Sequence, residues 1–246
     1  MNNQLSQNIL KNWQAELCAV ARPEKVEILQ RFFKTGKGQY GEGDVFVGVT
    51  VPDNRAVARR FCDAPFVVVE QMLQHEVHEF RLSALLCLVR KYELAKKSPE
   101  ARKEIVDFYL SQSARCNNWD LVDLSAPYIL GVELIAGRHH DTIRCFVKSD
   151  NLWQRRIAMV STLRPVTKVA QTDLAIEMAT ALLADQHDLI RKAVGWILRE
   201  VGKKDIHLLR RFLDGHINGV SAITLSYATE KMTKEERLKW RLKRKF

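Results

Sequence analysis

Three short blocks of the sequence place tryptophan, carboxylate and basic side chains at matching points of helical segments. They span residues 119–123 (WDLVD), 153–156 (WQRR) and 192–196 (KAVGW). Cationic side chains can hold phosphates, the face of an indole attracts positive charge, and a carboxylate can stabilise a cation electrostatically. These residue types indicate a surface that binds an anionic partner such as nucleic acid and that could stabilise a positive charge beside it.

The blocks belong to a repeating register. Counting back from Arg191, the equivalent positions are Arg155, Asn118 and Arg81, at spacings of 36, 37 and 37 residues. Each lies in a segment whose apolar residues recur with helical period. A period of this length indicates a helical repeat array. We therefore expect an all-α fold, an α-solenoid of HEAT-like repeats with one concave face, formed by residues 1–246 as a single domain.

In the segment that begins at Leu189, several residues lie off the face that is expected to pack in the core. Its apolar residues follow helical spacing, whereas a second stripe holds Lys192, Trp196, Arg199 and Lys203. A tryptophan among three cations is expected to lie outside the core, and Gly195 beside it would leave room for close approach to the helix. The alternative is that Trp196 packs against a neighbouring repeat while the cations are solvated.

Trp119 and Asp123 are four residues apart, which makes them neighbours on one helix face. Asp120 is better placed to serve the helix N-terminus, so Asp123 is the functional candidate. A structural carboxylate paired to an arginine is the alternative. Arg155 and Arg156 point about 100° apart, and the register equates Arg156 with Lys192. The register therefore favours Arg156 as the arginine that shares the stripe.

The composition favours an anionic partner. The 246 residues are 46% hydrophobic and carry a net charge of +10, with a pI near 9.5. About half of that charge lies in residues 232–246, a basic C-terminal helix or tail. This segment could track a phosphate backbone, or it could be a solvated terminal helix.

Five widely spaced cysteines without a C-x-x-C pair predict reduced thiols in a cytoplasmic protein. The N-terminus lacks the pattern of a signal peptide, and no uncharged apolar stretch of 18 residues occurs, so no membrane association is expected. No histidine or cysteine spacing indicates a metal, and we expect no cofactor. His75, His78 and the pair His139-His140 are interpreted as surface or capping residues.

A glycine-rich stretch, Gly36–Gly43, contains the pattern G-x-G-x-x-G. It follows a helix rather than a strand, which excludes a dinucleotide-binding turn. The stretch is either a plain connector or a loop that presents backbone N–H groups to a ligand. Residues 44–51 alternate as a short extended segment, and nearly all of the chain beyond them is predicted to be helical. One predicted helix, 119–130, contains Pro127 and should bend there.

The blocks also carry a family resemblance. Residues 117–123 (NNWDLVD), 149–156 (SDNLWQRR) and 190–200 (IRKAVGWILRE), with 22–25 (RPEK), resemble the AlkD-type DNA alkylation repair glycosylases. The resemblance implies HEAT-like repeats that hold DNA in a basic concave cleft and excise N3- or N7-alkylated purines. The family's two tryptophans, aspartate and arginine fall by motif position on Trp119, Trp196, Asp123 and Arg156. It implies double-stranded DNA containing alkylated bases as the partner, and we expect a monomer.

The chemistry of such a site fits these residue types. An alkylated purine is already cationic and leaves as a neutral base, so its excision needs no general acid. Asp123 could stabilise the oxocarbenium-like sugar and orient water, and Trp119 and Trp196 could contact the sugar. The remaining predicted site residues would bind DNA: Arg156, Lys192, Arg199, Phe32 and Arg155. The resemblance implies that the lesion is captured through the backbone and not in a deep base pocket.

Two positions depart from the family pattern. Phe32 stands where the pattern has tyrosine, which keeps the ring and removes the hydroxyl, and Asn118 replaces the first of two tryptophans before the aspartate. The connector after Phe32 is also longer. Two other functions therefore stay open beside the glycosylase: a non-catalytic protein for damaged or branched DNA, and a HEAT-type scaffold for an acidic protein.

Overall fold

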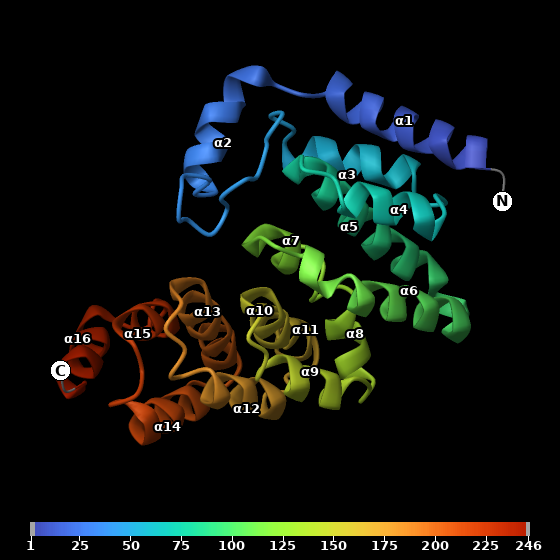
Figure 1. Ribbon diagram of the computed structural model, residues 1–246. Helices are drawn as coiled ribbons and strands as arrows, with labels where there is room; N and C mark the ends of the chain where they lie inside the picture. Colours follow the sequence, from blue (N-terminus) through green and yellow to red (C-terminus); the bar gives the residue numbers. More distant parts are fainter. Residues whose placement is uncertain (1–2, 245–246) are drawn as a thin grey trace. The chain divides into compact units, whose positions relative to one another are not determined.

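The protein is built from helices. The computed structural model describes residues 3–244, which form sixteen α-helices and three short 3-10 helices, with no strand (Figure 1). The predicted extended segment contributes one isolated parallel bridge, Val45 to Val77. The all-α prediction is confirmed. Among the described residues, none of the helices combines the length and apolar character that a membrane span requires, and all five cysteines are free.

The chain divides into two compact units, Met1–Ser125 (unit 1) and Ala126–Phe246 (unit 2). Unit 1 is organised around α5, because most of this helix is buried and the neighbouring helices α3, α4, α6 and α7 pack against it. The helices of unit 1 are α1 (Asn3–Ala19), η1 (Pro23–Lys25), α2 (Val26–Phe32), α3 (Val51–Arg60), α4 (Phe66–Leu73), α5 (His78–Leu94), η2 (Ala95–Lys97), α6 (Pro99–Ser111), η3 (Ser113–Arg115) and α7 (Trp119–Asp123).

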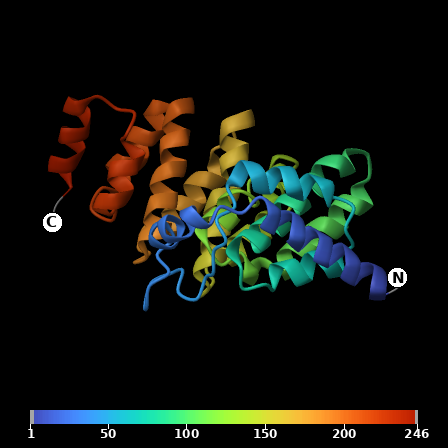
Figure 2. The same cartoon turned by 90° about the horizontal axis from the view of Figure 1, so that it is seen from above.

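Unit 2 is organised around α13, which packs against α10, α11, α12, α14 and α15 (Figures 1 and 2). Its apolar face is buried from Leu189 to Val201, as the helical spacing predicts. The helices of unit 2 are α8 (Leu130–Ile135), α9 (His140–Phe146), α10 (Leu152–Ser161), α11 (Leu163–Val169), α12 (Asp173–Ala181), α13 (Asp188–Lys204), α14 (Ile206–His216), α15 (Ala222–Ala228) and α16 (Lys234–Lys243).

The repeating register corresponds to a repeated arginine contact. Arg81 donates to the carbonyls of His75 and Glu76, at 2.9 and 2.8 Å. Arg155 donates to the carbonyls of residues 149 and 150, both at 2.9 Å, and Arg191 donates to that of residue 185 at 2.9 Å. In each case the guanidinium, near the start of a helix, satisfies carbonyl groups of the turn before that helix. The register that the sequence shows is therefore a structural pattern of the turns.

Helix ends explain most differences from the predicted helix bounds. The predicted helix 119–130 is wrong, because α7 ends at Asp123 and residues 124–129 form turns. Pro127 has no N–H to donate and disfavours helical backbone in the residue before it. The chain is not helical between α8 and α9 either, since Gly137 and His139 have φ of 76° and 62°, outside the right-handed helical region.

Gly195 allows two helices of unit 2 to approach closely. A Cβ atom at this position would lie 2.5 Å from Tyr227 Cβ and 2.6 Å from the Thr224 carbonyl oxygen, both on α15. The close approach expected at Gly195 is therefore made by α15. The space is filled by α15, whose Thr224 hydroxyl also donates to the Arg191 carbonyl at 3.1 Å.

Gly195→Ala should destabilise the protein by about 1–3 kcal/mol, because the added methyl group overpacks the α13–α15 contact. Urea unfolding measures the change. Gly215→Ala is the matched control, since a Cβ on Gly215 of α14 meets no atom within 4 Å. That variant should be neutral or more stable by about 0.4–1 kcal/mol. Equal effects at the two positions would contradict the packing argument.

Candidate functional site

The short helix α7 presents Trp119 and Asp123 one turn apart. Asn118 is its N-cap residue, and the Asn118 side-chain oxygen accepts a hydrogen bond from the Trp119 amide at 2.8 Å. Both Trp119 and Asp123 are half-buried. Phe32, at the end of α2, meets the Trp119 ring edge-on with centroids 5.6 Å apart, and Phe32 is 60% exposed. Unit 1 thus brings three of the predicted site residues into one region.

Trp119 lies on a stack of aromatic rings. Its indole is nearly parallel to the ring of Phe33, with centroids 5.2 Å apart and 12° between the planes. Phe33 in turn stacks on Phe46 at 5.1 Å. The imidazole of His78 packs against both phenyl rings, at 4.8 Å from Phe33 and 4.7 Å from Phe46. The stack therefore connects the half-exposed indole to a fully buried histidine.

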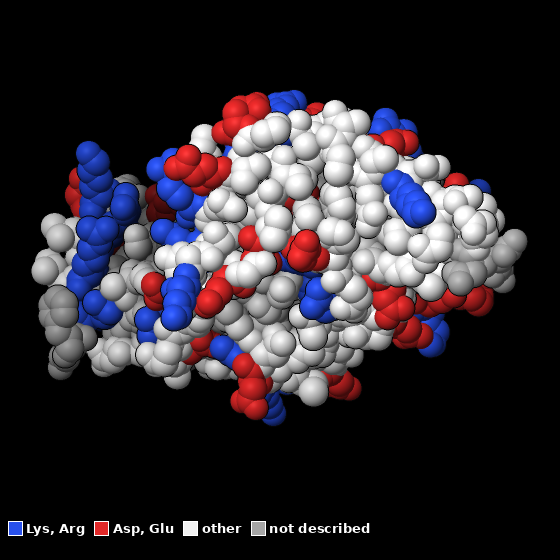
Figure 3. Space-filling view, turned by 45° about the horizontal axis from the view of Figure 1, so that its top comes forward, with Lys and Arg blue, Asp and Glu red and all other residues white. Residues whose placement is uncertain are grey.

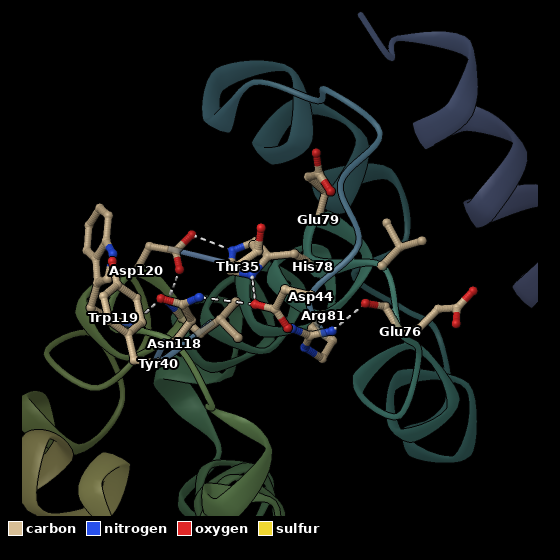
Figure 4. A network of polar contacts seen from close by, with 12 residues as sticks. Thr35, Tyr40, Asp44, Glu76, His78, Glu79, Arg81, Asn118, Trp119 and Asp120 are labelled. Carbon is tan, nitrogen blue, oxygen red and sulfur yellow. Dashed lines mark hydrogen bonds and ion pairs between the residues drawn. The ribbon is translucent and has the colours of Figure 1, made fainter. Parts of the chain in front are cut away.

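His78 bridges two buried carboxylates (Figure 4). Its Nδ1 lies 3.1 Å from Asp44 Oδ2, and its Nε2 lies 2.8 Å from Asp120 Oδ2. Asp44 also accepts hydrogen bonds from Arg81, at 2.5 Å, and from Asn118, at 3.1 Å. The side chains of the four charged residues are at most 7% exposed. The network joins the connector between α2 and α3, residues 33–50, to helix α5 and to helix α7.

The charges in this network favour a protonated His78. Burial alone lowers the pKa of the imidazole, but the charge and hydrogen bond of Asp120 and the hydrogen bond of Asp44 raise it from 6.5 to about 9. Burial raises the pKa of Asp44, yet the His78 hydrogen bond and the Arg81 charge hold it below 3.8. Each ring nitrogen of His78 therefore donates to a carboxylate, and two cations balance two anions.

The interpretation of His78 as a surface or capping residue is wrong, whereas His75 is partly exposed, and its Nδ1 accepts from the Val77 amide in the turn before α5, at 3.0 Å. Asp120 accepts from the Leu121 amide at 2.9 Å, as expected near a helix N-terminus, but it also binds His78. Sequence reasoning missed Asp44 and His78 as members of a network. The one local signal was a histidine at the start of a long apolar helix.

A cavity of about 220 Å³ lies beside the network in unit 1. Its lining includes Phe33, Phe46, His78, Glu79 and Asp120. The Glu79 carboxylate accepts from three successive backbone amides of the connector, at 3.1, 2.8 and 3.2 Å for residues 47, 48 and 49. These bonds fix the connector after the glycine-rich stretch. Among the described residues, no group of three or more His, Cys, Asp or Glu side chains is placed to hold a metal ion.

Unit 2 carries the other predicted residues. On α13, Lys192 is exposed and Trp196 is half-buried, off the apolar face as its spacing predicts. Arg199 is ion-paired with Glu230 and lies 3.3 Å from Glu200. The exposed Lys203 pairs with Glu200 at 2.8 Å. The stripe is therefore partly neutralised at its C-terminal end, and Lys192 is the exposed cation at its N-terminal end.

The two adjacent arginines are held inside unit 2. Arg156 is buried and donates to the Leu189 carbonyl at 2.5 Å, whereas Lys192 is exposed; that Arg156 shares the stripe of Lys192 stays a prediction. Arg155 is 20% exposed, and its Nε donates to Asp185 at 2.7 Å. Both arginines therefore contribute to the packing between α10, the turn before it and α13.

The basic C-terminal segment forms helix α16 up to Lys243, and Lys and Arg side chains gather towards this end of the chain (Figure 3). Part of its charge is paired, since Lys243 contacts Asp214. Two leucines of α16, Leu238 and Leu242, are exposed. Lys245 and Phe246 lie outside the described residues. The role of this segment as a DNA tether stays a prediction.

The stability of the protein should fall as the pH rises from about 6.5 to about 9. His78 keeps its proton in the folded state up to a pKa of about 9, whereas the unfolded chain releases it near 6.5. The stabilisation is complete below the lower value and disappears through the upper one, a loss on the order of 3 kcal/mol. Urea unfolding across this range measures it.

His78→Gln should be less stable and should show a much flatter pH dependence, because two buried carboxylates lose their cation. The matched control is His207→Gln, at an exposed position of α14, which should keep the wild-type slope. Parallel slopes for wild type and His78→Gln would show that the imidazole is not charged in the folded state.

Residues 13–232 match the family model of the DNA alkylation repair enzymes. No curated protein gives a significant match to the sequence. Among solved structures, the chain is similar to a predicted DNA alkylation repair enzyme from Enterococcus faecalis, with a TM-score of 0.67 and 18% identity over 87% of this chain and 97% of that one.

The chain is also similar to AlkD2 from Streptococcus mutans, with a TM-score of 0.55 and 21% identity over 84% of this chain and 97% of that one. For smu.31 from Streptococcus mutans UA159 the TM-score is 0.52, with 21% identity over 91% and 98%. At these identities the likeness is one of fold. Since the family match extends from α1 to the turn before α16, the protein belongs to the AlkD-like family of DNA alkylation repair enzymes.

Proposed function

We propose that the protein is a DNA glycosylase that hydrolyses the N-glycosidic bond of cationic N3- or N7-alkylated purines in double-stranded DNA. The observation that carries this proposal is the pair Trp119 and Asp123, half-buried and one turn apart on α7, in a member of this repair family. A HEAT-like solenoid with a basic concave cleft is the architecture that we propose for DNA binding. We place the activity in the cytoplasm, in a monomer without cofactor.

The proposed reaction needs charge stabilisation more than proton transfer. The alkylated base leaves as a neutral molecule, so positive charge develops on the sugar. Asp123 would stabilise that charge and orient the attacking water, while the Trp119 face would contact the sugar. Phe32, with its ring largely exposed beside Trp119, would contact the same strand without the hydrogen bond that a tyrosine could add.

Unit 2 would contribute the phosphate contacts. We assign the first of these to Lys192, because it is exposed at the N-terminal end of the α13 stripe, whereas the exposed Lys203 pairs with Glu200. Trp196 would offer a second aromatic face, and Arg199 would bind phosphate beside its ion pair with Glu230. Arg155 and Arg156 would be secondary phosphate contacts, because internal partners already hold both side chains.

A second candidate function is non-catalytic binding of damaged or branched DNA. Two observations favour it: Phe32 lacks the hydroxyl of the family pattern, and Arg156 is buried. Release of the base from DNA that contains N7-methylguanine separates the two functions, because only the glycosylase produces free base.

Asp123→Asn should lower the single-turnover excision rate by about 100-fold to 1,000-fold, because the amide keeps the shape of the carboxylate but removes its charge. DNA affinity and thermal stability should stay close to wild type. Base release, measured beside a thermal unfolding curve, tests both statements.

The matched control is Asp107→Asn on α6, where the side chain is 54% exposed and forms a surface pair with Lys103. This variant should excise at the wild-type rate. If Asp123→Asn instead unfolds several degrees earlier while its rate is retained, Asp123 is a structural ion-pair member and the assignment is wrong.

Lys192→Ala should weaken DNA binding without loss of stability. The slope of the logarithm of the binding constant against the logarithm of the salt concentration should fall by about 1, because one phosphate contact is lost. Arg155→Ala should mainly lower stability, by about 1–3 kcal/mol, because Asp185 and two turn carbonyls lose their donor. Fluorescence anisotropy over a series of salt concentrations, combined with urea unfolding, distinguishes them. Unchanged affinity for Lys192→Ala would remove the α13 stripe from the DNA interface.

A further inference from the structure

The residues on either side of Trp119 are tied to one buried cluster. Asn118 donates from Nδ2 to Asp44 at 3.1 Å, and Asp120 accepts from His78 Nε2 at 2.8 Å. Asp44 and His78 are themselves bonded at 3.1 Å. The bonds therefore form a closed ring that starts at the N-cap residue 118, passes through Asp44 and His78, and returns to the chain at residue 120 (Figure 4). Trp119 is the residue enclosed by that ring.

We propose that Asp44, His78, Asn118 and Asp120 form a clamp of positioning residues that fixes the Trp119 indole for base excision. The proposal rests on the proposed glycosylase function, and it adds four residues to which no role in the reaction has been given. None of the four is proposed to touch the substrate. Each would act through the position of Trp119.

Helix α7 needs such anchors because it is only five residues long. Helices of this length are unstable on their own, since too few backbone bonds offset the cost of forming the first turn. The clamp supplies two side-chain bonds to the rest of unit 1, one at the N-cap and one in the first turn. Without them the backbone at Trp119 would depend on apolar packing, which comes from the ring contacts and from the buried Leu121 and Val122.

The residue at position 118 makes different contacts from the residues at the equivalent positions of the other turns. The equivalent residues Arg81, Arg155 and Arg191 satisfy carbonyls of the turns before their own helices. Asn118 instead caps α7 and donates across the fold to Asp44, which also accepts from Arg81. Asp44 thereby links the turn before α7 to α5.

The aromatic stack gives the clamp a second route to the indole. The His78 ring contacts Phe33 and Phe46, and Phe33 contacts Trp119 face to face. His78 thus supports Trp119 through Asp120, along the backbone, and through Phe33, along the rings. A change at His78 should therefore move the indole even where the fold of the unit is retained.

The decisive experiment is a double-mutant cycle between His78→Phe and Trp119→Ala on the single-turnover excision rate. Phenylalanine keeps a ring between Phe33 and Phe46 but removes both bonds to the carboxylates. His78→Phe should lower the rate about 10-fold to 100-fold, with DNA affinity near wild type. In the Trp119→Ala background the same change should have little further effect, because the clamp has no indole left to position.

A second measurement follows the indole without any activity. In protein labelled with 5-fluorotryptophan, the fluorine resonance of Trp119 is assigned by its absence from Trp119→Phe. That resonance should shift or broaden in His78→Phe, whereas those of Trp13 and Trp153 should not. Asp107→Asn is the control for both measurements and should leave rate and spectrum unchanged.

A milder variant, Asn118→Ser, gives the same test if His78→Phe does not fold. Serine is a good N-cap residue, but its shorter side chain loses the bond to Asp44. Additive rate effects in the cycle, or an unchanged Trp119 resonance in the folded variants, overturn the clamp. If the wild-type protein releases no alkylated base, the glycosylase proposal fails separately, while the Trp119 resonance still tests the clamp.

Discussion

The buried imidazolium between two carboxylates is the constraint on which the arrangement of unit 1 depends. Asp44, His78, Arg81 and Asp120 are charged groups removed from water, and an unpaired charge in such a place costs about 3–5 kcal/mol. The groups come from the connector, from α5 and from α7. None of these segments can take its position unless the others supply the compensating charge, so the network fixes all three together.

Carbonyl groups in the turns also need partners. A turn before a helix contains carbonyl groups that the helix itself does not satisfy, and Arg81, Arg155 and Arg191 satisfy such groups at the repeated positions. Arginine suits this role because its planar guanidinium offers several donors at fixed angles. A 36- to 37-residue register with arginine at three of its four positions is thus what a chain of similar helical turns produces, and it does not by itself mark a phosphate-binding surface.

Features set by local helical spacing can be predicted from the sequence, whereas contacts between residues far apart in the chain cannot. The all-α fold, the core face of α13 and the position of Trp196 off that face follow from helical spacing. His78 could not be predicted, because its partners lie 34 and 42 residues away and no local pattern connects them. The partners of Arg156 and Gly195 could not be predicted for a related reason: the Leu189 carbonyl and helix α15, which contact these two residues, are distant from them in sequence.

The distribution of charge bears on the kind of reaction that unit 1 can support. Both N–H groups of His78 are donated to carboxylates, so this imidazolium cannot serve as a general acid for a leaving group. The half-buried groups on α7 are an indole and a carboxylate, which can stabilise a cation but need not transfer a proton. That combination suits a substrate that is already positively charged, because its base departs without protonation. A neutral base would require a donor, and the buried histidine nearest to Trp119 is committed to holding the helix in place.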